Sequence, residues 1–199
     1  IYHGVGENFN SSTGITSKSK YGTDYILYPS IIDVYKSQKE VIAAYKLLND
    51  KVGSGCPPLY LVGEKLGAYA IEVEETIKST NLENKVFVIG PADYEEMPAV
   101  YHNSFCLIYA SQSENCPNIL LEAMASGCSI ACSNYHPMSE FAGDSVLYFD
   151  PNDPIDIFNK LHLLINDASL RASLASEAKQ RALRFNWNTT FKNTWKFIM

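Results

Sequence analysis

Short apolar segments alternate with longer amphipathic ones along most of this chain, and this alternation restricts the possible folds more than any other feature. The apolar segments expected to form strands are 25–30, 59–63, 85–90, 105–110, 129–133 and 145–149. The segments expected to form helices are about 35–49, 67–79, 93–103, 153–167, 168–184 and 187–198, with one more after Pro117. Short apolar strands separated by helices are typical of a parallel sheet covered on both faces. The sequence therefore predicts an α/β fold with a doubly wound parallel sheet.

The beginning of the chain differs in composition from the rest. Residues 1–22 are rich in Gly, Ser, Thr, Asn and Lys, which predicts a linker or interdomain segment. Residues 23–199 contain all the alternating segments and are enough for one domain with a full core. Because the chain starts at Ile1 and shows no signal peptide, we interpret it as a piece of a longer protein.

Composition argues against several classes of protein. The formal net charge is −6 and no Lys/Arg-rich run is present, so the basic face that binds nucleic acid is not expected. No segment approaches the roughly 20 apolar residues of a membrane span. The five cysteines lie mostly in apolar surroundings, which predicts reduced thiols and a cytoplasmic location. No histidine completes a zinc spacing near Cys128 and Cys132, so no metal site is expected.

The segment 113–127, SENCPNILLEAMASG, combines two carboxylates with the start of an apolar helix. Pro117 suits the first helical position, which leaves the next amides as unpaired donors at the positive end of the helix dipole. These amides belong to Asn118, Ile119 and Leu120. Such a helix end binds phosphate, and Glu114 and Glu122 on either side can accept hydrogen bonds from sugar hydroxyls. A solvated Glu and a loop Glu are the structural alternative, but the surrounding residues favour a nucleotide-sugar site.

The carboxyl ends of the predicted strands bring the other candidate residues together. Ligands of parallel α/β sheets bind beyond these ends. The residues expected there are Ser30, Gly63, Gly90, 111–114 and 133–134. The two glycines allow a base or phosphate to approach closely, although ordinary turn chemistry explains them equally well. The segment 63–67 lacks the P-loop spacing, and no G-x-G-x-x-G follows the first strand, which argues against a nicotinamide enzyme.

Segment 113–127 resembles the E-x7-E motif of retaining glycosyltransferases with the GT-B fold, in particular glycosyltransferase family 4. Similar stretches in that family are followed by a strand and a P-x-x-E turn, here 128–141, and the segments 143–154 and 184–187 also resemble the family. The start, IYHGVGENF, is similar to the I-x-N-G-V segment that joins the two GT-B domains, with His3 in place of the usual Asn. The resemblance covers roughly residues 24–198. It implies the C-terminal, Rossmann-like half of a GT-B fold, without the N-terminal acceptor domain.

The resemblance also implies how a diphosphate would be held. Family members place an Arg after the first strand and a Lys six residues later, and both bind the donor pyrophosphate. The Lys position is Lys36, but the Arg position is occupied by Ser30. A guanidinium supplies a strong charge-assisted contact, so its loss weakens the expected phosphate site unless Lys39 or Lys65 compensates. The alternative for Lys36 is a solvated lysine on a helix.

Further roles follow from the same resemblance. Glu122 is implied to bind the ribose hydroxyls and Glu114 the hydroxyls of the transferred sugar, while Tyr94 lies in the loop that packs on the base. Glu114 and Lys36 are the implied catalytic residues, acting by binding and electrostatic stabilisation rather than as general acids. A carboxylate pair also occurs in glycoside hydrolases, but there the two groups flank a bond rather than a helix N-terminus.

We therefore expect the donor-binding domain of a glycosyltransferase that takes a UDP-, GDP- or ADP-sugar and needs neither metal nor cofactor. The acceptor is expected to be a glycan or lipid-linked hydroxyl compound bound through the absent domain, with peripheral membrane contact in the full protein. Alternatives are a sugar-nucleotide epimerase, a phosphorylase, or a non-catalytic interaction domain, which Ser30 supports best. The last helix carries Phe191, Trp195 and Phe197, which are expected to be exposed without the other domain or packed on this one.

Overall fold

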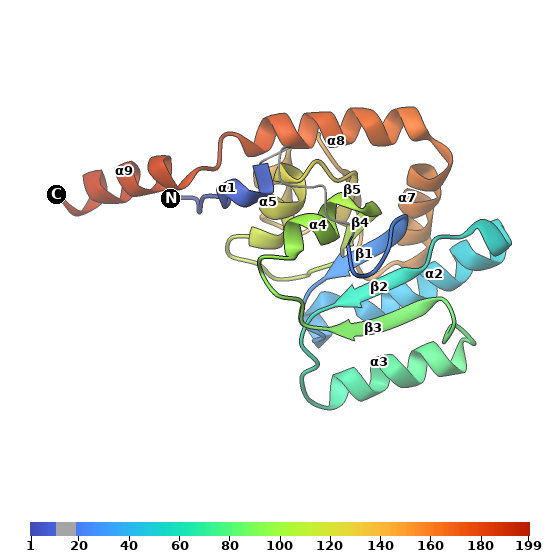
Figure 1. Ribbon diagram of the computed structural model, residues 1–199. Helices are drawn as coiled ribbons and strands as arrows, with labels where there is room; N and C mark the ends of the chain where they lie inside the picture. Colours follow the sequence, from blue (N-terminus) through green and yellow to red (C-terminus); the bar gives the residue numbers. More distant parts are fainter. Residues whose placement is uncertain (11–18) are drawn as a thin grey trace.

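A computed structural model describes residues 1–10 and 19–199 and contains a six-stranded, wholly parallel sheet (Figure 1). The strand order is β3-β2-β1-β4-β5-β6. The strands are β1 (Tyr25–Pro29), β2 (Leu59–Val62), β3 (Val86–Gly90), β4 (Ser104–Tyr109), β5 (Ile130–Ser133) and β6 (Leu147–Phe149). All six were predicted, and the fold class is confirmed as an α/β, Rossmann-like fold.

One short helix precedes the first strand, and the other helices connect the strands or follow the last one. They are α1 (Glu7–Asn10), α2 (Gln38–Val52), α3 (Gly67–Ser79), α4 (Met97–His102), α5 (Asn118–Ala125), α6 (Met138–Ala142), α7 (Pro154–Asn166), α8 (Ala168–Ala182) and α9 (Trp187–Ile198), with 3₁₀ turns η1 (Val34–Lys36) and η2 (Gly53–Gly55). The short helices α1 and α6 were not predicted, because neither is long enough to show a helical period in the sequence. The helix expected over 93–103 begins only at Met97.

The helices form a layer on each face of the sheet. On one side α2 contacts both α3 and α7, and on the other α5 contacts α1, α6 and α8. The central strand β1 is consequently buried along its whole length, and β4 is buried from Cys106 to Tyr109. Tyrosines can occupy this interior because their hydroxyls find acceptors: Tyr25 donates to the Val100 carbonyl at 2.6 Å and Tyr45 to the Pro57 carbonyl at 2.7 Å.

The first residues of the chain pack on the domain. Val5 and Phe9 are buried, and the Val5 amide donates to the Phe185 carbonyl at 3.0 Å. The Phe9 ring contacts the rings of Tyr94 and Tyr101 edge to face, at 5.4 and 5.8 Å between centroids. Residues 11–18 of the predicted 1–22 linker lie outside the described residues. The described start of the chain thus lies beside the loop after β3, where Tyr94 is found.

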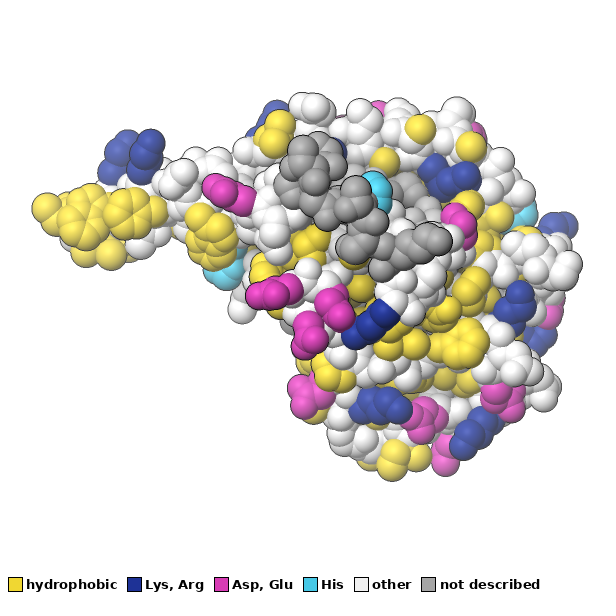
Figure 2. All heavy atoms as spheres, in the orientation of Figure 1, with side chains coloured by type: hydrophobic (Ala, Val, Ile, Leu, Met, Phe, Trp, Pro, Cys, Tyr) yellow, Lys and Arg dark blue, Asp and Glu magenta, His cyan; other side chains and the backbone are white. Residues whose placement is uncertain are grey.

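The last helix, α9, extends away from the rest of the domain (Figure 1). None of its residues is buried, and Phe191, Trp195 and Phe197 are 67%, 56% and 85% exposed. Hydrophobic side chains gather along its outer end (Figure 2). Of the two arrangements expected for these aromatic residues, the structure shows the exposed one. No helix in the described part of the chain has the length and apolar character to cross a membrane.

Candidate functional site

The strand order reverses between β1 and β4, and the loops that follow these two strands lie side by side at the carboxyl edge of the sheet. Ligands of doubly wound sheets bind at such a reversal, because the helices that follow the two strands leave on opposite faces. The loop after β1 supplies Lys36, and the loop after β4 supplies Glu114. The sequence prediction that candidate residues converge on this edge therefore agrees with the geometry.

Lys36 ends a 3₁₀ turn rather than opening a helix. The Asp33 carboxylate caps this turn by accepting a hydrogen bond from the Val34 amide at 2.6 Å. The helix α2 begins only at Gln38. The Tyr28 hydroxyl, rising from the core strand β1, donates to the Lys36 carbonyl. Lys36 is only 5% exposed, so the alternative of a solvated lysine on a helix is wrong.

The ammonium of Lys36 lies in a hydrogen-bonded cluster around one oxygen of Glu114. Glu114 Oε1 forms an ion pair with Lys36 Nζ, and it accepts hydrogen bonds from Tyr109 Oη at 2.5 Å and Ser111 Oγ at 2.6 Å. Lys36 Nζ also lies 3.2 Å from Ser111 Oγ. The two charged side chains are 6% and 15% exposed. Burial raises the pKa of Tyr109, and the Glu114 charge raises it further, so Tyr109 is a neutral hydroxyl donor.

The sequence did not identify Tyr109 as a site residue. It ends the apolar run of β4, where a tyrosine looks like ordinary core, and only its position next to the carboxyl end of the strand distinguished it. Ser111 was placed at the edge of the sheet by the sequence, without a role.

The helix α5 begins one residue later than predicted. Pro117 is its N-cap rather than its first residue, and it provides no side-chain cap. The Asn118 amide, which was expected to be free, donates to the Cys116 carbonyl at 2.9 Å. Ile119 and Leu120 remain first-turn residues whose amides have no carbonyl within the helix to bind. The phosphate-binding potential of this helix end thus depends on these two amides.

Glu122 lies in the middle of α5 and is half-buried. Its Oε2 accepts a hydrogen bond from the Tyr101 hydroxyl at 3.0 Å. Burial raises the pKa of Glu122, and the Tyr101 hydrogen bond offsets part of that rise. Tyr94 is 57% exposed nearby; its partial burial raises its pKa, and the Glu122 charge raises it further. The sequence did not predict Tyr101, because it reads as an apolar position of α4.

Ser30, at the expected Arg position, is buried and receives a hydrogen bond from Gln38 Nε2 at 3.1 Å. Gln38 also donates to the Ile31 carbonyl at 2.9 Å. The two lysines considered as substitutes for the missing guanidinium form exposed ion pairs, Lys39 with Glu72 at 3.0 Å and Lys65 with Glu74 at 2.6 Å. Within the described part of the chain, neither of these two lysines therefore takes the place of the missing guanidinium.

The two glycines at the strand ends are required for different reasons. Gly90 has a φ of 82°, which disfavours other residues, although a Cβ there would meet nothing within 4 Å. A Cβ on Gly63 would lie 1.9 Å from the Ser30 carbonyl oxygen. Gly63 therefore allows the loops after β1 and β2 to pack closely at the site.

Replacing Gly63 with Ala is expected to destabilise the domain by about 2 kcal/mol, because the added methyl group forces the backbone of the neighbouring loop to move. Urea unfolding followed by circular dichroism measures this change. Gly55→Ala is the matched control, since a Cβ at Gly55 meets nothing within 4 Å, and it should cost under about 0.5 kcal/mol. Equal stabilities for the two variants would contradict the packing argument.

A pocket of about 320 Å³ opens beside Glu114, lined also by Asn115, Cys116, His136 and Glu140. Glu140 accepts a hydrogen bond from the Tyr2 hydroxyl at 2.6 Å and pairs with His136 Nε2 at 3.2 Å. Carboxylate, amide and aromatic groups together suit a polyhydroxylated ligand.

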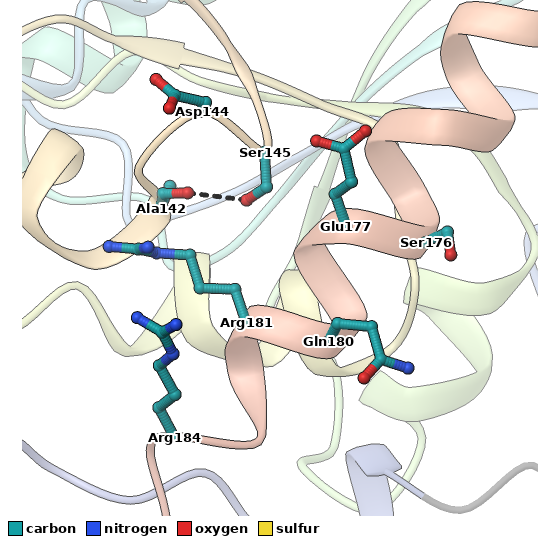
Figure 3. Close-up of a pocket in the computed structure, with 8 residues that line it drawn as sticks. All are labelled: Ala142, Asp144, Ser145, Ser176, Glu177, Gln180, Arg181 and Arg184. Carbon is teal, nitrogen blue, oxygen red and sulfur yellow. Dashed lines mark hydrogen bonds between the residues drawn. The ribbon is translucent and has the colours of Figure 1, made fainter.

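A larger hollow of about 540 Å³ lies elsewhere, between α8 and the loop that precedes β6 (Figure 3). Arg181 projects from α8 into it, and its guanidinium donates to the carbonyls of Phe141 and Glu140 at the end of α6. Because Arg181 serves to hold α6, and because the hollow lies where β6 begins rather than ends, we do not assign the ligand site to it.

Comparison with known proteins finds a matching family and several relatives. The sequence model of the glycosyl transferases group 1 matches residues 16–181. O-antigen chain mannosyltransferase B of Escherichia coli is 26% identical over 170 residues, which are 85% of this chain and 44% of that protein. A Campylobacter jejuni α-N-acetylgalactosaminyltransferase acting on an undecaprenol-diphosphate-linked sugar is 27% identical over 180 residues, 88% of this chain and 46% of that protein. This chain thus spans less than half the length of these two relatives.

Solved structures share the fold. Anabaena HepE, in complex with UDP and glucose, superposes with a TM-score of 0.86 at 21% identity, covering 100% of this chain and 55% of that one. The C-terminal domain of the group 1 glycosyl transferase LpcC from Francisella tularensis gives a TM-score of 0.76 at 22% identity, covering 89% and 95%.

Proposed function

This chain belongs to the group 1 glycosyl transferases, and we propose that it is the donor-binding domain of a retaining enzyme that uses a nucleoside-diphosphate sugar. The observation that carries the proposal is the Lys36–Glu114 pair, which lies where the strand order reverses and directly before the helix α5. A cation, a helix N-terminus and a carboxylate thus lie at one edge of the sheet, which supports binding of a diphosphate and a sugar there.

Each part of the donor finds a matching group. Lys36 and the amides of Ile119 and Leu120 bind the diphosphate, and they stabilise the charge that develops on it as the sugar leaves. Glu122 accepts hydrogen bonds from the ribose hydroxyls. The Tyr101 hydroxyl donates to its Oε2 atom, which leaves Oε1 for the ribose. Glu114, facing the 320 Å³ pocket, accepts hydroxyls of the transferred sugar. The reaction moves the sugar to an acceptor hydroxyl with retained configuration and without an essential metal ion or cofactor.

The whole enzyme is proposed to act in glycan assembly at the cytoplasmic side of a membrane, with a glycan or lipid-linked acceptor held by a part outside this chain. The names of the Escherichia coli and Campylobacter jejuni relatives support an acceptor of this kind. UDP and glucose in the Anabaena structure support a nucleotide-sugar donor. Residues 1–199 alone are proposed to bind the donor without turnover.

A degenerate, non-catalytic transferase domain is the second candidate. Ser30 in place of the family Arg favours it, since neither Lys39 nor Lys65 is turned toward the site. Nucleotide binding separates the two candidates, because a scaffold has no need of it.

Calorimetric titration with UDP, GDP and ADP, each alone and as a sugar conjugate, tests the proposal. We expect one base to bind saturably and Glu122→Ala to weaken that binding by about 10-fold or more, because hydrogen bonds to a charged group are lost. No binding of any nucleotide at millimolar concentration would move the non-catalytic candidate to first place.

A further inference from the structure

The ammonium of Lys36 is already engaged by the protein. It pairs with Glu114 and lies 3.2 Å from Ser111 Oγ and 3.5 Å from Tyr109 Oη. It also lies over the rings of Tyr35 and Tyr109, at 4.7 and 5.3 Å from their centroids. The donor diphosphate of the proposed function needs the same ammonium. The inference below rests on that proposed function.

Among the described residues, Lys39 and Lys65 do not relieve this competition, because each forms an ion pair with a glutamate of α3. Lys36 is the only buried Lys or Arg among the described residues. The family Arg is replaced by the uncharged Ser30, whose hydroxyl is bound by Gln38. An incoming diphosphate and the Glu114 carboxylate therefore compete for one positive charge, and the carboxylate repels the phosphate at short range.

Glu114 can lose the ammonium without losing its position. Its Oε1 keeps the hydrogen bonds from Tyr109, at 2.5 Å, and Ser111, at 2.6 Å. Tyr109 is held rigidly because it ends the buried strand β4 and is itself 1% exposed. The two hydroxyls thus keep the carboxylate at the edge of the 320 Å³ pocket that it lines.

We propose that Glu114 is the internal counter-ion of Lys36, that the donor diphosphate displaces it, and that Tyr109 and Ser111 hold the released carboxylate in position for the sugar. Tyr109 and Ser111 are accordingly positioning residues of the donor site. Phosphate binding and sugar binding are coupled through this exchange, since the carboxylate becomes a stronger acceptor for sugar hydroxyls once its cation has moved to the phosphate.

The exchange predicts opposite effects of one substitution on two ligands. Glu114→Gln keeps an oxygen for Tyr109 and Ser111 but removes the charge, so it should bind the bare nucleoside diphosphate about 5- to 20-fold more tightly than the wild type. The additional affinity that the attached sugar provides should fall by about 5- to 10-fold, because a charged acceptor is lost. A residue that only stabilised the fold would weaken binding of both ligands.

Two further variants complete the calorimetric experiment, after circular dichroism has shown that each is folded. Glu140→Gln removes a carboxylate from the same pocket without touching Lys36, and its affinity for the bare diphosphate should stay within about twofold of wild type. Tyr109→Phe leaves both charges but removes the hydroxyl that donates to Glu114 and accepts from Lys36, so it should reduce mainly the sugar contribution, by about 5-fold.

The outcomes distinguish this inference from the proposed function. If the wild type binds no nucleotide, the proposed function fails and the inference fails with it. If the wild type binds but Glu114→Gln binds the bare diphosphate equally or more weakly, only the counter-ion exchange is overturned. An equal gain in affinity for the bare diphosphate in Glu140→Gln would also overturn the exchange, because the gain would then arise from the change in net charge alone.

Discussion

Replacing Lys36 with Met is expected to lower the free energy of unfolding by about 3 kcal/mol, near the lower end of the range for breaking a buried ion pair. Met keeps the aliphatic stem but leaves the Glu114 carboxylate, 15% exposed, without its cation. The hydroxyls of Tyr109 and Ser111 still donate to that carboxylate and limit the loss. Nucleoside diphosphate binding should also fall, by about 100-fold or more, because the phosphate loses a charge-assisted contact in a desolvated position.

Urea unfolding and calorimetric titration measure the two effects. Lys46→Met is the matched control: Lys46 forms an exposed i,i+4 pair with Asp50, so its loss should cost under about 0.5 kcal/mol. The double variant Lys36→Met with Glu114→Gln should recover much of the lost stability, since no uncompensated charge remains, but none of the diphosphate affinity. A stable Lys36→Met protein that binds nucleotide normally would remove Lys36 from the site.

The parallel sheet could be predicted from the sequence because each strand carries its own signal. Strands such as β1 and β4 are continuous apolar runs, and burial on both faces requires such runs in a covered parallel sheet. The last residues of each run then identify the ligand-binding edge without further information. The strand order, which places the loop after β1 beside the loop after β4, was not predicted and comes from the structure.

The contacts within the site could not be predicted in the same way. Tyr109 and Tyr101 read as core positions, and only the three-dimensional packing shows that their hydroxyls reach Glu114 and Glu122. The 3₁₀ turn at Lys36 depends on the Asp33 cap and on Ser37 at a φ of 52°, neither of which produces a periodic pattern. Pair contacts between distant loops depend on tertiary packing, which spacing along one chain does not encode.

The site also shows a conflict between stability and ligand binding that the two glutamates resolve differently. Glu114 is compensated inside the protein by a cation and two hydroxyls, so it costs little in the free domain. Among the described residues, Glu122 receives a hydrogen bond only from the Tyr101 hydroxyl, so we expect a bound ligand to supply further donors. The removal of the Glu122 charge should therefore stabilise the free domain, whereas the removal of the Lys36 charge should destabilise it.

Replacing Glu122 with Gln is expected to raise the free energy of unfolding at neutral pH and to weaken nucleotide binding by about 10- to 100-fold, because the ribose hydroxyls lose a charged acceptor. The stability gain arises because burial raises the pKa of Glu122 in the folded state. Between the unfolded and folded pKa values the folded protein binds more protons than the unfolded chain, so wild-type stability falls as pH rises through this window. Gln does not titrate, and the Tyr101 hydroxyl can still donate to its oxygen.

The difference in unfolding free energy between Glu122→Gln and the wild type, measured from neutral pH down to pH 4, isolates this residue from the other carboxylates. It should be positive at neutral pH and shrink as the pH falls through the folded pKa, because the wild-type side chain then becomes neutral as well. Glu75→Gln, an exposed substitution on α3, should show no comparable trend. Saturating nucleotide should reverse the order of stability, since it stabilises the wild type in proportion to its tighter binding. If Glu122→Gln is less stable than the wild type at neutral pH without ligand, the protein itself already stabilises the charged Glu122 carboxylate. The physical argument that Glu122 binds a ligand would then fail.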